Sequence, residues 1–406
     1  NLRATSGIDL KVAASATRWW RFGTAGSGPR LPPFRASARL RDAQQGYRLD
    51  DLELKVADNI VKASLQVVRS GLRLRITGKA AAPLIDLARL APDAGTTTVP
   101  RGAAASPRAA GHWKLVDMDL DLNIGRLVFP GGRELRSGSG RIALEDGRLH
   151  AKGLQAMFGG AKAMLEGSVA DPQNLAGLDV GVAVQGGELA ELFNFFGVSI
   201  RQVGTYQGRA RMQGSLDALR LTAIDLQAGR PGQSMHVTGQ IEDVAGRRGI
   251  QLAMTASISN STAAGVLLGI ELPRLPSLRA TARLIDAPGG YAFEDLKLSM
   301  GRTSIQGRIA HARGEPRPRI TADLSGPLVD LSEWPRPQRK PGGTNPLLAA
   351  DVEANLRFDR VVLPGRRALG PVSGGVRLEA GALEFKQFTV AVEGASATVE
   401  GKIGDP

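Results

Sequence analysis

The stretch RASARLRDAQQGY at residues 35–47 recurs as RATARLIDAPGGY at residues 279–291, and this repetition decides the fold. The similarity extends outward without a gap: residues 31–90 align with 275–334 at a constant offset of 244, and 23 of the 60 positions are identical. Unrelated segments would share only about four or five of these positions. Such a long period predicts a protein that is built by stacking copies of one structural unit.

A second ungapped match joins residues 117–172 to 351–406 at an offset of 234, with 22 of 56 positions identical. The offset is smaller by ten because the linker at about residues 91–112 is longer than the one at about 335–348. Both linkers are rich in Pro, Gly and small polar residues, which is the composition of exposed connections. The duplication therefore covers most of the chain and tolerates a change of length between its two parts.

The match also continues upstream, since Gly7–Thr17 resembles Gly249–Ser259. We therefore expect a first pass through the repeat at residues 1–172, an intervening β-rich module at 173–248, and a second pass at 249–406. We expect these parts to form one continuous elongated domain.

Short stretches within each pass alternate apolar and polar residues, which is the period of a strand with one buried face. Leu52, Leu54 and Val56, for example, alternate with three charged residues. A clean alternation favours an antiparallel sheet that is covered on one side only. The apolar residues that we expect to share one face and to line a groove are Leu52, Leu54, Val56, Leu72, Leu74, Ile76, Leu120, Leu122, Ile124, Ile142, Leu144, Leu296, Leu298 and Met300.

Four segments carry short helical signals: PLIDLARL at residues 83–90, GELAELFNFFG at 187–197, STAAGVLLG at 261–269 and PLVDLSEW at 327–334. Proline near the start or glycine just after the end suits a helix boundary. The predicted fold class is therefore mostly β, with an elongated, curved antiparallel sheet of tandem repeats, a taco-like groove and a few short helices.

Composition excludes several classes of function. The chain has no Cys, so disulfides and thiolate metal sites are impossible, and its four histidines are not spaced as metal ligands. The net charge is +13, but only 18 of the 406 residues are aromatic and the basic residues do not cluster with them. We therefore expect no metal, no cofactor and no nucleic-acid partner.

Catalytic motifs are also missing from the sequence. It contains no P-loop, no GxSxG elbow, no dinucleotide-binding fingerprint and no HExxH. Paired carboxylates occur in turns of both passes, which is typical of structural residues. We expect no catalytic residue and no enzyme.

No run of 18 apolar residues occurs, and residues 1–8 lack the pattern of a secretion signal. We expect any membrane anchor to lie outside this sequence.

The phrases RITGKAAAPLIDLARL (Arg75–Leu90) and RITADLSGPLVDLSEW (Arg319–Trp334), with LEDGRLHAKGLQAMFGGAKAMLEGSV from Leu144, resemble the repeat of the AsmA-like family. The resemblance covers nearly the whole chain, although each motif is degenerate. It implies a bridge-like lipid-transfer protein of the bacterial periplasm, with a taco-shaped sheet and an N-terminal helix in the inner membrane. The implied partners are phospholipid or another acyl lipid and the membranes of the cell envelope.

Two other interpretations stay open at the level of sequence. The apolar stripes could be the core side of a closed sandwich. The protein could also be a scaffold for outer-membrane protein assembly that binds client strands at an exposed sheet edge. We expect a non-enzymatic protein that shields acyl chains in an apolar β-groove between the inner and outer membranes, and its protein partners and the identity of the lipid stay undetermined.

Overall fold

The computed structural model places most of the chain. It describes residues 7–17, 20–21, 30–44, 46–71, 73–87, 89, 115–129, 131–172, 174–195, 197, 199–200, 202–215, 217–259, 276–333, 350–365, 367–392 and 394–404. The two predicted linkers and the segment at 261–269 lie outside these residues, so the helix expected at 261–269 stays a prediction.

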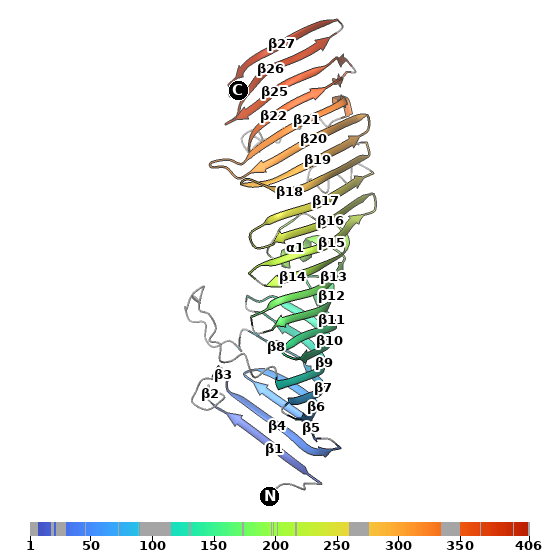
Figure 1. The fold of residues 1–406 in the computed structure, drawn as a ribbon. Helices are drawn as coiled ribbons and strands as arrows, with labels where there is room; N and C mark the ends of the chain where they lie inside the picture. The colour runs from blue at the N-terminus through green and yellow to red at the C-terminus, as the bar shows by residue number, and fades with distance from the viewer. Residues whose placement is uncertain are drawn as a thin grey trace. The chain divides into compact units, whose positions relative to one another are not determined.

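Strands hold 76% of the described residues. One curved, unclosed sheet contains 25 strands, and β2 (Trp20–Arg21) and β3 (Arg30–Leu31) form a separate ribbon. The chain divides into two compact units, of residues 1–186, 191–198 and 211–217, and of residues 187–190, 199–210 and 218–406. Figure 1 shows the strands of each unit stacked side by side. The mostly β, curved and predominantly antiparallel fold that the sequence predicts is confirmed.

In the first unit the hydrogen-bonded order follows the chain. Neighbouring strands are antiparallel, except that β7 and β8 both pair with β9 in parallel. The strands are β1 (Asp9–Ala16), β4 (Phe34–Ala43), β5 (Gly46–Val56), β6 (Asn59–Ser70), β7 (Arg73–Ala82), β8 (Ile85–Asp86), β9 (Val116–Val128), β10 (Glu134–Glu145), β11 (Arg148–Phe158), β12 (Ala161–Asp171) and β13 (Ala176–Gly186).

The second unit repeats this pattern, and its parallel pairs join β21 to β22 and to β23. Its strands are β15 (Leu219–Arg230), β16 (Gln233–Asp243), β17 (Arg248–Ile258), β18 (Leu278–Ala287), β19 (Gly290–Met300), β20 (Thr303–Ala312), β21 (Arg319–Asp330), β22 (Asp351–Phe358), β23 (Val361–Val362), β24 (Ala368–Leu369), β25 (Val372–Glu379), β26 (Ala382–Val392) and β27 (Ala395–Ile403). Residues of β14 (Thr205–Ser215) are divided between the two units.

The two passes through the sequence repeat share strand bounds and register. β4 and β5 begin and end 244 residues before β18 and β19, and β11 does so 234 residues before β26. The parallel pair Ile85–Leu127 returns as Val329–Val361. Asp51 and Asp295, which occupy equivalent bulges, both have a φ of 51°. The duplicated sequence therefore produces the same hydrogen-bonding pattern twice.

The helix predicted over PLIDLARL is wrong. Ile85 and Asp86 instead form β8 and pair with Leu127 and Val128, and the Leu87 amide donates to the Val128 carbonyl at 2.9 Å. In the second pass β21 runs through the equivalent residues to Asp330, and only the three-residue 3₁₀ turn η3 (Leu331–Glu333) follows. Pairing with a strand about 40 residues later overrides the local helical tendency.

A glycine lies at the parallel junction of the first pass. Gly125 of β9 lies against Pro83, and a Cβ atom at Gly125 would come within 2.6 Å of the Pro83 carbonyl oxygen. Glycine permits such a close backbone approach, whereas the second pass forms the same junction with Asp359 at the equivalent position. In the second pass the same region closes into a hydrophobic cluster of Val329, Phe358, Val361 and Val372.

One predicted helix is present as α1 (Leu189–Phe195). Its first residues, Leu189 and Ala190, are buried, and at its other end Phe195 packs against Phe158 with ring centroids 4.8 Å apart. A Cβ atom at Gly160 would meet the Glu191 carboxylate, so α1 lies close over the turn between β11 and β12.

Glu188 fixes the start of α1. Its carboxylate accepts backbone N–H groups from Val203 at 2.7 Å, Gly204 at 3.0 Å and Ala190 at 3.3 Å, and it binds Arg230 at 2.7 Å. Burial alone would raise the pKa of Glu188, but the Gly204 amide, Arg230 and the other two amides stabilise the charged form and lower the pKa to about 2.

The same two positions are in contact at the parallel junction of each pass, through an ion pair in the first and a backbone hydrogen bond in the second. In the first pass Arg89 pairs with Asp58 and, at 3.3 Å, with Asp86. At the equivalent positions of the second pass the charges are reversed: Glu333 accepts the backbone N–H of Arg302 at 3.1 Å. The two positions therefore stay in contact although the charges and the interacting groups differ.

The invariant part of this junction is an aspartate. The Asp86 amide donates to Asn59 Oδ1 at 2.5 Å, and the Asp330 amide donates to Thr303 Oγ1 at 3.0 Å. Asp330 is 2% exposed, and Arg302 lies 3.5 Å from its carboxylate. The basic partner of the aspartate therefore comes from different strand connections in the two passes.

We predict that Asp58→Arg weakens this junction by at most about 1 kcal/mol, because it places two cations together on the surface. Adding Arg89→Glu recreates the arrangement of the second pass and restores stability. Hydrogen exchange at the Asp86 and Leu87 amides measures both effects. If the change in the free energy of opening in the double variant equals the sum of the changes in the two single variants, the two residues do not act as a pair.

We predict that Glu188→Gln loosens the start of α1 by about 1–3 kcal/mol, because it removes a charged acceptor of several hydrogen bonds. The folded pKa of about 2 lies below the ordinary value of 4.5, so this stabilisation is complete above about pH 5. It disappears as the pH falls from about 4.5 to about 2. Measuring the free energy of unfolding between pH 7 and pH 2 checks this prediction. If Glu188→Gln loses as much stability over this range as the natural protein does, the prediction is contradicted.

Candidate functional site

The sheet of the first unit separates apolar from charged side chains. Residues that pair across neighbouring strands lie on the same face. Leu54 of β5 pairs with Ala36 of β4 and Val61 of β6. The same face includes Ala80 of β7, which pairs with Leu122 of β9.

The face continues through the remaining strands of that unit. Ile142 of β10 pairs with Leu120 and Ala151, and Leu165 of β12 pairs with Leu154 and Val182. We call this surface the first apolar face; its larger side chains are Leu40, Leu49, Leu52, Leu54, Val56, Val61, Leu65, Val67, Leu74, Ile76, Met118, Leu120, Leu122, Ile124, Ile142, Leu144, Leu149, Leu154, Leu165, Val180, Val182 and Val184.

The second unit has an equivalent surface. Leu298 of β19 pairs with Ala280 and Ile305, and Leu324 of β21 pairs with Leu356 of β22. We call it the second apolar face; its larger side chains are Leu226, Met235, Val237, Ile241, Ile250, Leu252, Met254, Leu278, Leu284, Phe293, Leu296, Leu298, Met300, Ile305, Ile309, Leu324, Leu356, Val376, Leu378, Phe385, Phe388 and Val390.

The opposite side of the first unit is covered by cross-strand ion pairs. Arg39 binds Asp9 at 2.5 Å, Arg141 binds Asp119, and Arg73 lies 3.5 Å from Asp117. The hydrogen bond from Arg141 lowers the pKa of Asp119. Solvent-exposed pairs of this kind each add little stability, but they keep this face hydrated.

The second unit has the same charged side. Arg209 and His236 both bind Asp225 at 2.8 Å, and Arg283 and Arg308 lie near Glu294. The hydrogen bond from His236 is the largest cause that lowers the pKa of Asp225, followed by the one from Arg209. Because these ion pairs lie on one side, the sheet of each unit offers its other side to apolar partners.

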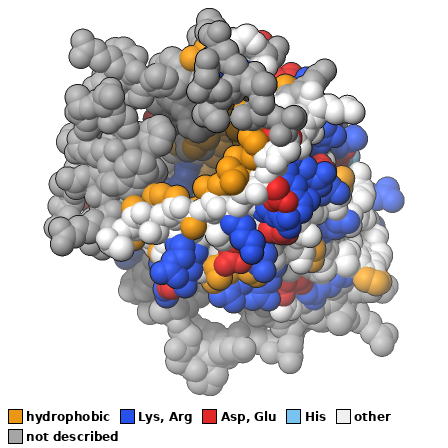
Figure 2. Space-filling model, turned by 90° about the horizontal axis from the view of Figure 1, so that it is seen from below, with side chains coloured by type: hydrophobic (Ala, Val, Ile, Leu, Met, Phe, Trp, Pro, Cys, Tyr) orange, Lys and Arg blue, Asp and Glu red, His pale blue; other side chains and the backbone are white. Residues whose placement is uncertain are grey.

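Figure 2 shows this separation in the view from below. Hydrophobic side chains line a hollowed surface, while Lys, Arg, Asp and Glu side chains gather on the outer side.

All the described groove residues that the sequence predicts lie on an apolar face. Leu144 and Met300 are buried, Leu74 is 41% exposed, and the others are half-buried. Leu72 lies outside the described residues. The candidates before Leu144 share the first apolar face with it, whereas Leu296, Leu298 and Met300 belong to the second.

Sequence reasoning missed a large part of both faces. Val180, Val182 and Val184 of β13 alternate with small or polar residues, and this signal is as clear as that of β5. Phe385 and Phe388 of β26 were harder to find because a bulge lies between them and shifts the alternation by one residue.

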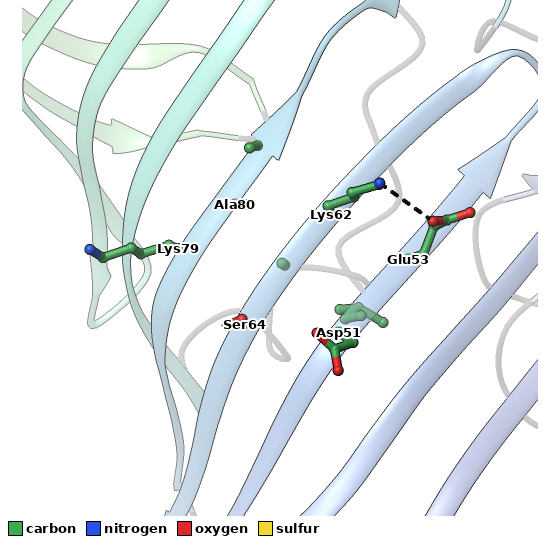
Figure 3. Close-up of a pocket in the computed structure, with 9 residues that line it drawn as sticks. Asp51, Glu53, Lys62, Ser64, Lys79 and Ala80 are labelled. Atoms are coloured by element: carbon green, nitrogen blue, oxygen red, sulfur yellow. Dashed lines mark ion pairs between the residues drawn. The ribbon is translucent and has the colours of Figure 1, made fainter.

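A shallow depression of about 330 Å³ lies elsewhere, on the charged side of β5 to β7 (Figure 3). Figure 3 shows Lys62 directed toward Glu53, with which it forms an ion pair at 4.0 Å. The depression is lined by Asp51, Leu52, Glu53, Lys62, Ala63, Ser64, Lys79, Ala80 and Ala81. Its mixed charges give it no apolar enclosure, so the candidate site is the apolar face and not this depression.

Known proteins give no independent assignment of these faces. No family model, curated protein or solved structure matches the chain. Among the described residues, no helix has both the length and the apolar character needed to cross a membrane. The functional argument therefore depends on the chemistry of the two faces.

Proposed function

We propose that this protein is a non-enzymatic lipid-binding protein that shields acyl chains along its apolar sheet faces. The observation that carries the proposal is the pairing register, which places Leu, Ile, Val and Met of successive strands on one side and ion pairs on the other. Apolar surface that extends over many strands is rare unless it meets a ligand, a membrane or a partner.

The energetics suit a mobile ligand. Each CH₂ group that leaves water for an apolar surface gains about 0.8 kcal/mol, so an acyl chain binds firmly without a specific polar site. A face of similar aliphatic side chains offers nearly equal energy at each strand. Bound chains therefore slide from strand to strand against small barriers.

The resemblance to AsmA-like proteins supports phospholipid as the ligand and the bacterial periplasm as the location. In this proposal the protein carries lipid between the inner and outer membranes, held by an anchor that lies outside the sequence given. Arginines beside the apolar faces are suitable partners for phosphate groups.

A closed sandwich does not fit the observed strands. A sandwich requires two packed sheets, whereas the described strands form one unclosed sheet and one two-stranded ribbon.

A scaffold for β-barrel assembly is the second candidate. Within the described part of the chain β1 and β27 each have one hydrogen-bonded neighbour, and all 9 residues of β27 are exposed. Strands of this kind can pair with a strand of another chain. A scaffold needs such an edge but no apolar face, so lipid binding separates the two functions.

We predict that the protein purified from bacterial cells carries phospholipid that lipid mass spectrometry detects at more than trace stoichiometry. Changing Leu52, Leu54, Leu296 and Leu298 to Asn removes that lipid, because each substitution replaces aliphatic surface by an amide that keeps its water.

The matched control changes the neighbouring charged-side residues Glu53, Lys55, Lys297 and Ser299 to Asn. This variant keeps its lipid, and circular dichroism shows that both variants retain their strands. If the natural protein is free of lipid and does not take up a fluorescent phospholipid, lipid binding is excluded and the scaffold becomes the leading account.

A further inference from the structure

The connections between strands differ at the two sides of each unit where the strands begin and end; the word edge refers here to these sides and not to the edge strands β1 and β27. At one edge, which we call the turn edge, strands are joined by short turns such as those between Ala43 and Gly46 and between Ala287 and Gly290. At the opposite edge, which we call the covered edge, the chain leaves for much longer connections, such as those after β1, β8 and β17. The direction of each strand, fixed by its pairing, places the ends of β1, β8 and β17 on the same side of their own unit, although the connection after β8 returns to the turn edge, where β9 begins.

Exposure of the apolar face changes from one edge to the other. In β19, Tyr291 at the turn edge is 45% exposed, whereas Met300 at the covered edge is 5% exposed. In the first unit Tyr47 at the turn edge is 44% exposed, and Asn59, across from the end of β5, is 3% exposed. Along β5 and β19 the apolar face is therefore accessible at the turn edge and closed at the other, whereas in β10 Leu144 is 3% exposed although it lies at the turn edge.

Both passes place the same two residues at the accessible edge. Tyr47 pairs with Asp42, and Tyr291 pairs with Asp286. The aspartates are engaged by backbone N–H groups: Asp42 accepts from Ile8 at 2.8 Å and Asp286 from Ile250 at 3.0 Å. The tyrosines stay exposed at the end of an aliphatic surface.

Tyrosine suits a border between apolar and wet surroundings, because its ring is apolar and its hydroxyl forms hydrogen bonds. In both units it stands where the apolar face meets water. His311 stacks on Tyr291 at 5.1 Å and holds the ring in place.

We propose that phospholipid enters across the turn edge. Its head group then stays at that edge, beside Tyr47 or Tyr291, while its acyl chains extend along the apolar face toward the covered edge. This inference depends on the proposed function, since it assigns the orientation of the lipid on the same faces. The dimensions agree: an 11-residue strand such as β19 spans about 35 Å, and one leaflet of acyl chains, half of a bilayer core, is about 15 Å thick. Chains anchored at Tyr291 therefore cover Phe293 and reach about as far as Leu296.

The test uses two prolines at opposite edges of the second unit. Pro288 lies in the turn between β18 and β19, and Pro231 lies in the turn between β15 and β16; both are exposed and both precede a glycine. The chain has no cysteine. Pro288→Cys and Pro231→Cys therefore each carry one fluorophore at a matched position, one at the turn edge and one at the covered edge.

Each labelled protein is loaded with a phospholipid that bears a nitroxide on its head group, or with the same lipid bearing the nitroxide at the end of an acyl chain. We expect the head-group nitroxide to quench the fluorophore at position 288 at least about threefold more than that at position 231, since the edges are about 35 Å apart. The acyl-chain nitroxide shows no such preference for position 288.

Equal quenching at both positions, or stronger head-group quenching at position 231, overturns the orientation while lipid binding stands. Failure of the natural protein to bind either lipid overturns the proposed function instead. Gln44, which is exposed in the turn between β4 and β5, offers a second position at the turn edge of the first unit. Gln44→Cys therefore tests the orientation even if one proline variant does not fold.

Discussion

The two-residue period of a β-strand is the constraint on which the rest of the structure depends. Neighbouring strands must form hydrogen bonds in a fixed register, and a slip of one residue would exchange the two faces. Where a strand carries an extra residue, as at the bulge beside Asp51, the alternation changes phase so that Leu49 and Leu52 both stay on the apolar face. The separation of apolar and charged surfaces is therefore a property of the hydrogen-bonding ladder.

A sheet with one apolar side is stable in water only if part of that side is shielded from the solvent. The covered edge does so locally: Asn59 and Thr303 are buried beneath the strand ends that carry Asp86 and Asp330. At the turn edge the same strands have short turns and leave their apolar residues accessible. Along β5 and β19 this difference gives one closed and one open end of the apolar face, and it is the physical basis for assigning a direction to a lipid bound there.

The duplication shows which contacts the fold requires. The two passes differ at most positions, yet the parallel junction keeps its register, its buried polar acceptor and its aspartate. The charges of residues 58 and 89 are exchanged at 302 and 333, and Glu333 binds the backbone N–H of Arg302 where Arg89 binds the Asp58 carboxylate. The junction therefore tolerates a change of the interacting groups at these two positions while its register and its aspartate stay the same.

The sequence by itself determined the strands, the repeat and the face on which the apolar residues lie, because alternation and self-similarity are local properties of the chain. Only the tertiary structure decided that Ile85 and Asp86 are strand and not helix, since their hydrogen-bond partners lie about 40 residues away in β9. It also decided the role of Glu188, whose partners at Val203, Gly204 and Arg230 come from separate segments. Local sequence encodes periodicity, whereas pairing between distant strands depends on which backbone groups meet, and a pattern of residue types does not specify that.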